Sequence, residues 1–507
     1  MLSVDAGEMS RQQNYITQIG LYQAEYQRRN GVSRKYWIHT YGCQLNENDG
    51  EKIAGLLDEM GFNPAVESRD ADLIVLNTCS IRENANDKLY GNLGMIKNLR
   101  RDRPDMIVAV CGCMMKQEEH VAKIRRSYGF VDLIFGPQDL HRLPELLYQR
   151  IFQNQKPYGV GREDSMAEGL PIHRARKFRA LCSIMYGCNN FCTYCIVPYA
   201  RGRERSRRPE DILAELRQLA AAGYREVMLL GQNVNSYGHD WTGTPVEDQA
   251  GADAKGSGRP YDFAALLADA ARIGGLYRIR FMTSHPKDIS SELLKTMSRY
   301  PVIEPHLHLP MQSGSNHILE QMNRHYTRER YLDIIREARS LIPDLALSTD
   351  IIVGFPGETE ADFQDTLDLM EQVQFDSAFT FQYSKRAGTP AAAMAGQIPA
   401  DVVSERFGRL TALQNSHSLA SNQRWVGRSA EVLIEGRSGT ADQILSGRTA
   451  QNHLVNFSVP DPSMLPASCR RPDGSIDGAA MEGSLAQVRL TLAKSFSLEG
   501  YLEAWHA

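Results

Sequence analysis

The stretch Cys188-Asn189-Asn190-Phe191-Cys192-Thr193-Tyr194-Cys195 carries three cysteines at spacings of four and three residues. Three thiolates on one short loop can hold one face of a soft metal ion or an iron–sulfur cluster and leave a fourth coordination position open. A structural zinc site is the alternative, but a closed zinc site takes four ligands, and no nearby His or Cys completes this set. Cys182 lies in a predicted strand and is expected to point elsewhere. The spacing of this stretch, hereafter the cluster loop, therefore favours an open cluster site.

The cluster loop follows the first of six apolar segments that alternate with helical patterns. The predicted strands are 178–185, 226–230, 277–282, 306–309, 345–353 and 376–383, and the predicted helices are 209–222, 263–273, 289–299, 327–342 and 360–372. Six β/α units are too few for a closed eight-stranded barrel. We therefore expect an open, partial (β/α)6 barrel whose site lies at the carboxyl ends of its strands, where the cluster loop begins.

A second alternation precedes the loop and is typical of a doubly wound parallel α/β domain. Its predicted strands are 36–41, 72–77, 106–110 and 131–135, and its predicted helices are 46–60, 83–100, 116–126 and 137–151. Cys43, Cys79 and Cys113 each follow one of the first three strands. Because the carboxyl ends of parallel strands meet at one edge, we expect these thiols to share a crevice. Three ordinary buried cysteines are the alternative. Cys111 alternates with Cys113 along the same strand, so only one should face the crevice, and we favour Cys113.

The C-terminal part reads as a helix followed by β-structure. Residues 401–425 have helical apolar spacing, and 430–434, 450–459 and 486–492 are β-like segments punctuated by glycine. This pattern favours a small β-barrel. We expect an irregular loop over 461–480, in which Cys469 is a bystander rather than a ligand.

Composition narrows the class of protein. The 507 residues suffice for about three domains. No apolar run could span a membrane and no signal-peptide core precedes the polar N-terminus, so we expect a soluble, cytoplasmic protein without a membrane partner. Nine cysteines in strand-end contexts fit a reducing compartment and metal binding better than disulfides.

A formal net charge of −4 gives no bulk signal for nucleic acid. The one dense basic run, 201–208, is either solvated or in contact with RNA phosphate or with the carboxylate of a cofactor. Residues 241–260, rich in Gly, Ala and Asp, are predicted to be an insertion without chemistry.

The cluster loop resembles the signature of the radical S-adenosylmethionine (SAM) enzymes, C-x-x-x-C-x-x-C with an aromatic residue before the last cysteine, here Tyr194. The resemblance implies that Cys188, Cys192 and Cys195 hold a 4Fe–4S cluster, with the amino and carboxylate groups of SAM on the open iron. In that family the reduced cluster cleaves SAM to a 5′-deoxyadenosyl radical, so the cofactor carries the difficult step.

The same resemblance implies where SAM binds. Gly231, Gln232 and Asn233 match the place at which radical SAM enzymes hold the SAM amino group. Later strand-end motifs, 283–286, 310–315 and 350–358, are similar to those of the family and supply Ser284, Gln312 and Asp350 as candidate contacts.

Three N-terminal motifs narrow the resemblance to the methylthiotransferases: 40–46 (TYGCQLN), 77–82 (NTCSIR) and 112–114 (GCM). In that family three such cysteines hold a second, auxiliary 4Fe–4S cluster, which implies that role for Cys43, Cys79 and Cys113. Gln44 and Asn46 resemble the MiaB-type branch, which acts on tRNA. The implied substrate is N6-isopentenyladenosine beside the anticodon, and the implied product is its 2-methylthio derivative.

The resemblance also implies partners and domains. Electrons would come from a flavodoxin or ferredoxin, and the C-terminal barrel resembles the RNA-binding TRAM domain. The expected divisions are an N-terminal tail (1–34), a methylthiotransferase domain with the auxiliary cluster (35–153), a radical SAM domain (168–416) and a TRAM-like barrel (418–503).

Two alternatives stay open. A sister methylthiotransferase, acting on a ribosomal protein or on threonylcarbamoyladenosine tRNA, would share every cluster cysteine. A metal-stabilised RNA-binding protein without catalysis would need closed sites with four ligands each.

Overall fold

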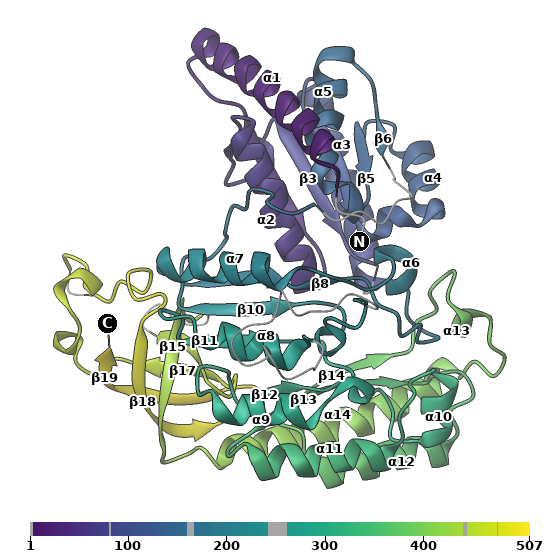
Figure 1. The fold of residues 1–507 in the computed structure, drawn as a ribbon, viewed down its shortest axis with the longest axis vertical. Helices are drawn as coiled ribbons and strands as arrows, with labels where there is room; N and C mark the ends of the chain where they lie inside the picture. The colour runs from purple at the N-terminus through teal and green to yellow at the C-terminus, as the bar shows by residue number, and fades with distance from the viewer. Residues whose placement is uncertain are drawn as a thin grey trace. The chain divides into compact units, whose positions relative to one another are not determined.

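The computed structural model describes residues 4–80, 83–159, 167–241, 261–439, 444–473 and 475–506 (Figure 1). The chain divides into two compact units. Unit 1 is Met1–Ala175, Tyr186–Asn189 and Cys195–Arg205, and unit 2 is Arg176–Met185, Asn190–Tyr194 and Ser206–Ala507. The chain passes between the units at the short strands β8 (Met185–Tyr186) and β9 (Arg205–Ser206) and within the cluster loop. Cys188 and Cys195 thus belong to unit 1, whereas Cys192 belongs to unit 2.

Unit 1 contains a six-stranded parallel sheet in the order β2-β1-β3-β4-β5-β6. Its strands are β1 (Lys35–Thr40), β2 (Asn63–Pro64), β3 (Leu73–Thr78), β4 (Ile107–Gly112), β5 (Leu133–Phe135) and β6 (Tyr158–Gly159). The order reverses between β1 and β3, which makes the sheet doubly wound, as predicted. In such sheets, ligands bind where the order reverses, outside the carboxyl ends of the strands.

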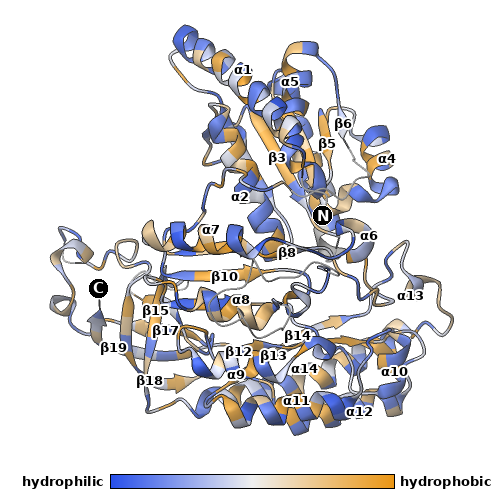
Figure 2. Cartoon of the chain, viewed as in Figure 1, coloured by the Kyte–Doolittle hydropathy of each residue, from blue (hydrophilic) through white to orange (hydrophobic). Residues whose placement is uncertain are grey.

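Helices cover both faces of this sheet. They are α1 (Ala6–Asn30), α2 (Gln44–Glu59), α3 (Glu83–Asp102), α4 (Glu118–Ser127) and α5 (Leu143–Gln153). Apolar residues of α1, α2 and α5 form one core with the sheet, and those of α3 and α4 form the other. Every residue of β3 is buried, because the strand lies in the middle of the sheet. Figure 2 shows the corresponding run of hydrophobic residues along β3.

Residues 1–34, which the sequence sets apart as a tail, contain helix α1. Ile16 and Ile19 of this helix belong to the core beneath α2 and α5. Tyr15 also lies against Tyr148 of α5, with ring centroids 4.9 Å apart. The helix is otherwise polar, and for that reason its composition alone does not suggest burial.

We expect Ile19→Ala to lower the free energy of unfolding of unit 1 by about 2 to 5 kcal/mol, the usual cost of truncating a buried isoleucine. Ile19 is 0% exposed, whereas Leu21 on the same helix is 68% exposed. Leu21→Ala is therefore the control, with an expected change within about 0.5 kcal/mol. Urea unfolding of both variants measures the difference; equal stabilities would show that α1 is not packed in solution as it is here.

Unit 2 contains the predicted six parallel strands of a partial barrel. They are β7 (Arg179–Ser183), β10 (Glu226–Leu230), β11 (Arg278–Phe281), β12 (His306–His308), β13 (Ala346–Val353) and β14 (Ser377–Gln382). They form two sheets, β11-β10-β7 and β12-β13-β14. A parallel bridge between Ile279 and Ile303 joins these sheets in chain order. Over the described ranges no ladder pairs β14 with β7, so the barrel is open.

Helices follow the strands of the partial barrel. They are α7 (Pro209–Ala221), α8 (Phe263–Ala270), α9 (Ser291–Arg299), α10 (Asn316–Gln321), α11 (Arg328–Leu341) and α12 (Glu360–Val373). α13 (Pro390–Ala393) and α14 (Ala400–Gln423) come after β14. α10 was not predicted, and residues 242–260 of the predicted insertion lie outside the described residues, as do 160–166 between the first two predicted domains.

The C-terminal segment of unit 2 is a closed barrel in the order β15-β16-β17-β19-β18. Its strands are β15 (Ser429–Arg437), β16 (Ile444–Thr449), β17 (Leu454–Ser458), β18 (Leu485–Ala493) and β19 (Leu498–His506). The barrel confirms the predicted class, but the sequence did not indicate β16 or β19. Cys469 is buried in the barrel core. No helix in the part of the chain that the structure describes is long and apolar enough to cross a membrane.

Candidate iron–sulfur and cofactor sites

The three N-terminal thiols lie on neighbouring loops at one edge of the sheet in unit 1. Cys43 is the N-cap of α2 after β1, Cys79 directly follows β3, and Cys113 begins a 3-10 turn after β4. Cys79 and Cys113 are buried, whereas Cys43 is partly exposed. A hydrogen bond from Cys79, together with the Arg201 guanidinium, lowers the pKa of the Cys43 thiol to about 6 against the effect of burial. Burial raises the pKa of Cys113 to about 11.

The glycines before two of these cysteines permit the close approach of the loops. Gly42 has a φ of +104° and Gly112 a φ of +98°, a region that side chains rarely adopt. A Cβ atom at Gly42 would overlap the side chain of Cys79, and one at Gly112 would overlap the backbone of Thr78. The Gly-Cys pairs are therefore required by the crowding of this edge.

We expect Gly42→Ala to disrupt the three-thiol edge, because the added methyl group meets the Cys79 side chain and the backbone is strained at positive φ. Reconstituted protein should lose about half of its iron if this edge holds one of two 4Fe–4S clusters. Gly91→Ala in α3, where a Cβ atom meets nothing within 4 Å, is the matched control and should keep the full iron content. Equal iron in both variants would contradict the crowding argument.

Asn46 ties the loops together. Its Nδ2 donates to the carbonyl oxygens of Tyr41, at 2.9 Å, and Thr78, at 2.7 Å. In return, Asn77 Nδ2 donates to the Asn46 carbonyl at 2.8 Å. Because these groups are buried, each bond satisfies a backbone oxygen that would otherwise be costly to bury. Asn46, three residues after Cys43, thus holds the ends of β1 and β3 together.

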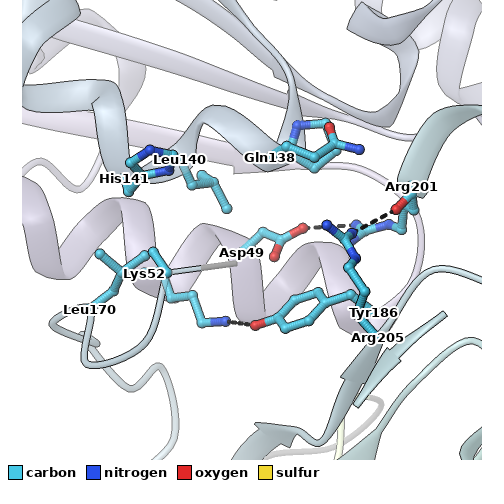
Figure 3. Close-up of a pocket in the computed structure, with 11 residues that line it drawn as sticks. Asp49, Lys52, Gln138, Leu140, His141, Leu170, Tyr186, Arg201 and Arg205 are labelled. Atoms are coloured by element: carbon cyan, nitrogen blue, oxygen red, sulfur yellow. Dashed lines mark hydrogen bonds and ion pairs between the residues drawn. The ribbon is translucent and has the colours of Figure 1, made fainter. Parts of the chain in front are cut away.

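Arg201 joins the same network from α6 (Val197–Arg201). Its Nε lies 3.0 Å from Cys113 Sγ, and its Nη2 lies 2.6 Å from Asn46 Oδ1 and 2.8 Å from Asp49 Oδ2. The pocket in Figure 3 shows the facing Arg201 and Asp49 side chains, with Lys52 Nζ donating to the Tyr186 hydroxyl at 2.7 Å. All residues that line this pocket belong to unit 1.

The buried positions of two arginines correct the prediction for the basic run 201–208. Arg201 and Arg207 are 4% and 8% exposed. Arg207 Nη1 donates to the Ser183 carbonyl at 2.6 Å and pairs with Glu215 at 2.9 Å. These two arginines therefore stabilise the protein interior, whereas Arg203 and Arg208 of the same run are exposed.

Cys111 does not join the three-thiol edge. It lies inside β4, is 1% exposed and packs in the core shared with α2 and α5. Its sulfur is 3.8 Å from Asn77 Oδ1, and burial raises its pKa well above the ordinary value. Cys113 differs because it lies beyond the end of β4, in the 3-10 turn that follows Gly112, where its sulfur meets Arg201. The preference for Cys113 came with the wrong reason, since residues two apart in a strand point to the same face.

The residues of the cluster loop make hydrogen bonds within each unit. In unit 1, the Cys188 amide donates to the Gly202 carbonyl at 3.1 Å. In unit 2, Asn323 Nδ2 donates to the carbonyls of Asn190 and Phe191, and Arg324 Nη1 lies 3.5 Å from Cys192 Sγ. Cys182 lies in β7 within the barrel core, as predicted.

Neither Asn323 nor Arg324 was predicted. Both follow α10, 130 to 133 residues after the loop residues that they contact, and no local pattern marks them. Arg324 is 4% exposed and also donates to the Pro310 carbonyl at 2.9 Å. It thereby links Cys192 to the carboxyl end of β12.

The predicted SAM contacts lie at the strand ends of the partial barrel. After β10, a Cβ atom at Gly231 would lie 2.6 Å from Met185 Cγ, so this turn has no room for a side chain. Asn233 is buried, and its Nδ2 donates to Asp288 Oδ2 at 2.6 Å. Gln232 is only partly buried. After β12, the Gln312 amide donates to the Asp350 carbonyl at 2.8 Å, and Asp350 Oδ1 lies 3.6 Å from His308 Nε2.

Several buried polar atoms near these strand ends lack a partner among the described residues. They are Asn233 Oδ1, both polar side-chain atoms of Asn235, Ser284 Oγ and His285 Nε2. Burial also lowers the pKa of His285 strongly, so its ring is neutral. Buried polar groups are normally satisfied. A polar ligand such as SAM would satisfy them, and the residues present therefore fit it.

The described residues contain no group of three or more His, Cys, Asp and Glu side chains placed around a single metal ion. In a 4Fe–4S cluster each liganding cysteine binds a different iron, so the thiolates stand further apart than the ligands of one ion. The donor set, thiols with N–H donors beside their sulfurs, fits an iron–sulfur cluster.

Comparison with known proteins defines the class first. A family model of the radical SAM superfamily matches residues 182–370, and one described as Uncharacterized protein family UPF0004 matches residues 35–136. Among solved structures, the radical S-adenosylmethionine methyltransferase TsrM from Kitasatospora setae shares the fold. Its TM-score is 0.50 at 15% identity, over 71% of this chain and 77% of that one. The chain is thus a radical SAM enzyme.

Full-length relatives define the family. The chain is 46% identical to the tRNA-2-methylthio-N(6)-dimethylallyladenosine synthase of Acetivibrio thermocellus, over 98% of this chain and 97% of the relative. It is 45% identical to the synthase of the same name from Clostridioides difficile, over 99% and 98% of the two chains. The chain belongs to the family of tRNA-2-methylthio-N(6)-dimethylallyladenosine synthases.

Proposed function

We propose that this protein converts N6-isopentenyladenosine beside the tRNA anticodon to its 2-methylthio derivative, inserting sulfur and a methyl group at carbon 2 of the base. The observation that carries the proposal is the convergence of Cys43, Cys79 and Cys113 at one sheet edge in a chain that also carries the radical SAM loop. The printed names of its full-length relatives support the substrate.

Two 4Fe–4S clusters are proposed, one for each set of three cysteines. The cluster of Cys188, Cys192 and Cys195 would supply the electron that cleaves SAM, and that of Cys43, Cys79 and Cys113 would carry the sulfur to be inserted. An unactivated aromatic C–H bond is too inert for acid–base chemistry, which is why both are needed in one chain. The protein's own part is to bind and orient these groups.

The described side chains suggest how that orientation is achieved. Arg324 would fix the Cys192 thiolate through its guanidinium, and Asn323 would fix the loop backbone. We propose that SAM lies against Gly231, Gln232, Asn233, Ser284, Gln312 and Asp350. The unpartnered oxygens of Asn233 and Ser284 are then available to its polar groups.

The remaining assignments are proposals of the same kind. The proposed substrate partner is the anticodon stem-loop of tRNA. The proposed electron donor is a flavodoxin or a ferredoxin, and the proposed location of the protein is the cytoplasm. The domains would be 35–153, 168–416 and a TRAM-like RNA-binding barrel at 418–503. A sister methylthiotransferase, acting on a ribosomal protein or on threonylcarbamoyladenosine tRNA, is the second candidate. The surroundings of Cys43, with Gln44 and Asn46, favour the first.

The test is anaerobic incubation of the reconstituted protein with SAM, a reductant and isopentenylated tRNA, followed by mass analysis of the nucleosides. We expect the methylthio product, and about eight iron and eight sulfide per chain. Two control substrates are matched to it: the same tRNA without the isopentenyl group, and a tRNA that carries threonylcarbamoyladenosine. Release of 5′-deoxyadenosine with unchanged isopentenylated tRNA would reject the substrate, and zinc without iron would reject the enzyme.

A further inference from the structure

Arg201 contacts a predicted cluster ligand that lies far from it in the sequence. It follows the cluster loop by six residues, yet its Nε donates to Cys113 Sγ, 88 residues earlier, at 3.0 Å. Both residues belong to unit 1. The side chain of Arg201 is only 3% exposed, as is that of its ion-pair partner Asp49. The arginine is therefore a buried, ion-paired side chain and not part of a solvated basic surface.

We propose that Arg201 is the positioning residue of the second cluster: it holds the Cys113 thiolate in place and raises the reduction potential of the cluster on Cys43, Cys79 and Cys113. The inference rests on the proposed function, which assigns a cluster to these cysteines. It adds to that assignment a residue from the segment that follows the radical SAM loop.

The geometry fixes the guanidinium on three sides. Asp49 Oδ2 accepts from Nη2 at 2.8 Å and Asn46 Oδ1 accepts from the same nitrogen at 2.6 Å, which leaves Nε directed at Cys113. Asn46 is itself anchored to the loops after β1 and β3. Movement of Arg201 is thus coupled to the backbone near all three cysteines.

The chemistry follows from charge. Reduction adds one electron to a cluster, and its potential depends on nearby charge, on hydrogen bonds to the sulfurs and on exposure. An N–H donor from a cation stabilises the more negative, reduced state, and burial limits the screening of that interaction. Removing the cation leaves Asp49 near the cluster as an uncompensated anion, which lowers the potential further.

Two substitutions separate charge from geometry. Arg201→Gln removes the cation. Arg201→Lys keeps the charge but lacks the planar fork that reaches Cys113 and Asp49 together. Arg207 is the matched control, because it lies in the same basic run, is buried and ion-paired to Glu215. Its sulfur neighbour, at 3.8 Å, is Cys182, which is no predicted ligand.

The test uses the full chain with Cys188, Cys192 and Cys195 all replaced by alanine, which leaves one cluster. The background should bind about four iron. The comparison is made at the midpoint potential of the background protein. At that potential, we expect Arg201→Gln to lower the ratio of reduced to oxidised cluster at least tenfold. For one electron this corresponds to about 59 mV. Arg201→Lys should give a smaller shift, and Arg207→Gln none, in a redox titration followed by electron paramagnetic resonance.

The outcomes are distinct. Four iron and an unchanged potential in Arg201→Gln would overturn the inference and leave the proposed function standing. A background without iron would overturn the proposed function, and the inference with it. Loss of iron in Arg201→Gln with an unchanged circular dichroism spectrum would support the positioning role. The reduction potential of the cluster would then be measured on Arg201→Lys instead. If both Arg201 variants fail to fold, the residue is structural and the inference is wrong.

Discussion

Replacement of Cys188, Cys192 and Cys195 together by alanine is expected to abolish SAM cleavage, so that no 5′-deoxyadenosine is released above the level without enzyme. The three thiols are the protein's whole contribution to the proposed open-iron site, and no other side chain of the loop can replace them. Anaerobic assays with chemical reductant and chromatographic detection of 5′-deoxyadenosine measure the loss. About half of the iron should remain, on the other three cysteines.

The control is Cys469→Ala. Cys469 is also a buried cysteine, but it lies in the core of the C-terminal barrel. Its replacement removes packing there and should leave SAM cleavage and iron content unchanged. Release of 5′-deoxyadenosine by the triple variant at the parent rate would show that the radical is made elsewhere.

Replacement of Cys43, Cys79 and Cys113 together by alanine is expected to have the opposite pattern. SAM cleavage should persist, because the cluster loop is intact, while the methylthio product disappears, because the proposed sulfur carrier is lost. Nucleoside mass analysis and 5′-deoxyadenosine quantification in the same reaction give both readings. The ratio of product to 5′-deoxyadenosine should fall at least a hundredfold, roughly 2.8 kcal/mol at 1.4 kcal/mol per tenfold change.

Cys111 provides the internal control for that experiment. Cys111→Ala should keep the product, because its side chain packs in the core beneath the sheet rather than beside Arg201. If Cys111→Ala loses the product and Cys113→Ala keeps it, the third ligand is Cys111.

The alternation of strands and helices was predictable because the parallel sheets of both units are built from short apolar strands with strong turn signals between them. The predicted segment 226–230 coincides with β10, and 209–222 differs from α7 by one residue. Helix α1 was missed for the opposite reason. Its buried residues, Gln12, Ile16, Ile19 and Gln23, recur at helical spacing, but two of the four are polar, so no apolar stripe marks the buried face.

The placement of Cys43, Cys79 and Cys113 after strands was predictable because each follows a clear apolar segment. The side chains that orient them were not. Arg201 and Arg324 act on sulfurs that lie 88 and 132 residues away in the chain, and only the folded structure brings them there. The basic run containing Arg201 was noticed, but charge density alone cannot separate a buried ion pair from a solvent-exposed one.

The contact between Arg201 and Cys113 also constrains how the protein is made. Ribosomes add about 5 to 20 residues per second. Cys113 therefore exists for roughly 4 to 18 seconds before the arginine 88 residues later is synthesised. During that interval Arg201 is not yet present to contact Cys113. Iron that arrives early would therefore meet a thiol that the arginine has not yet oriented. We therefore expect the proposed cluster on Cys43, Cys79 and Cys113 to reach its final orientation only after Arg201 has been synthesised.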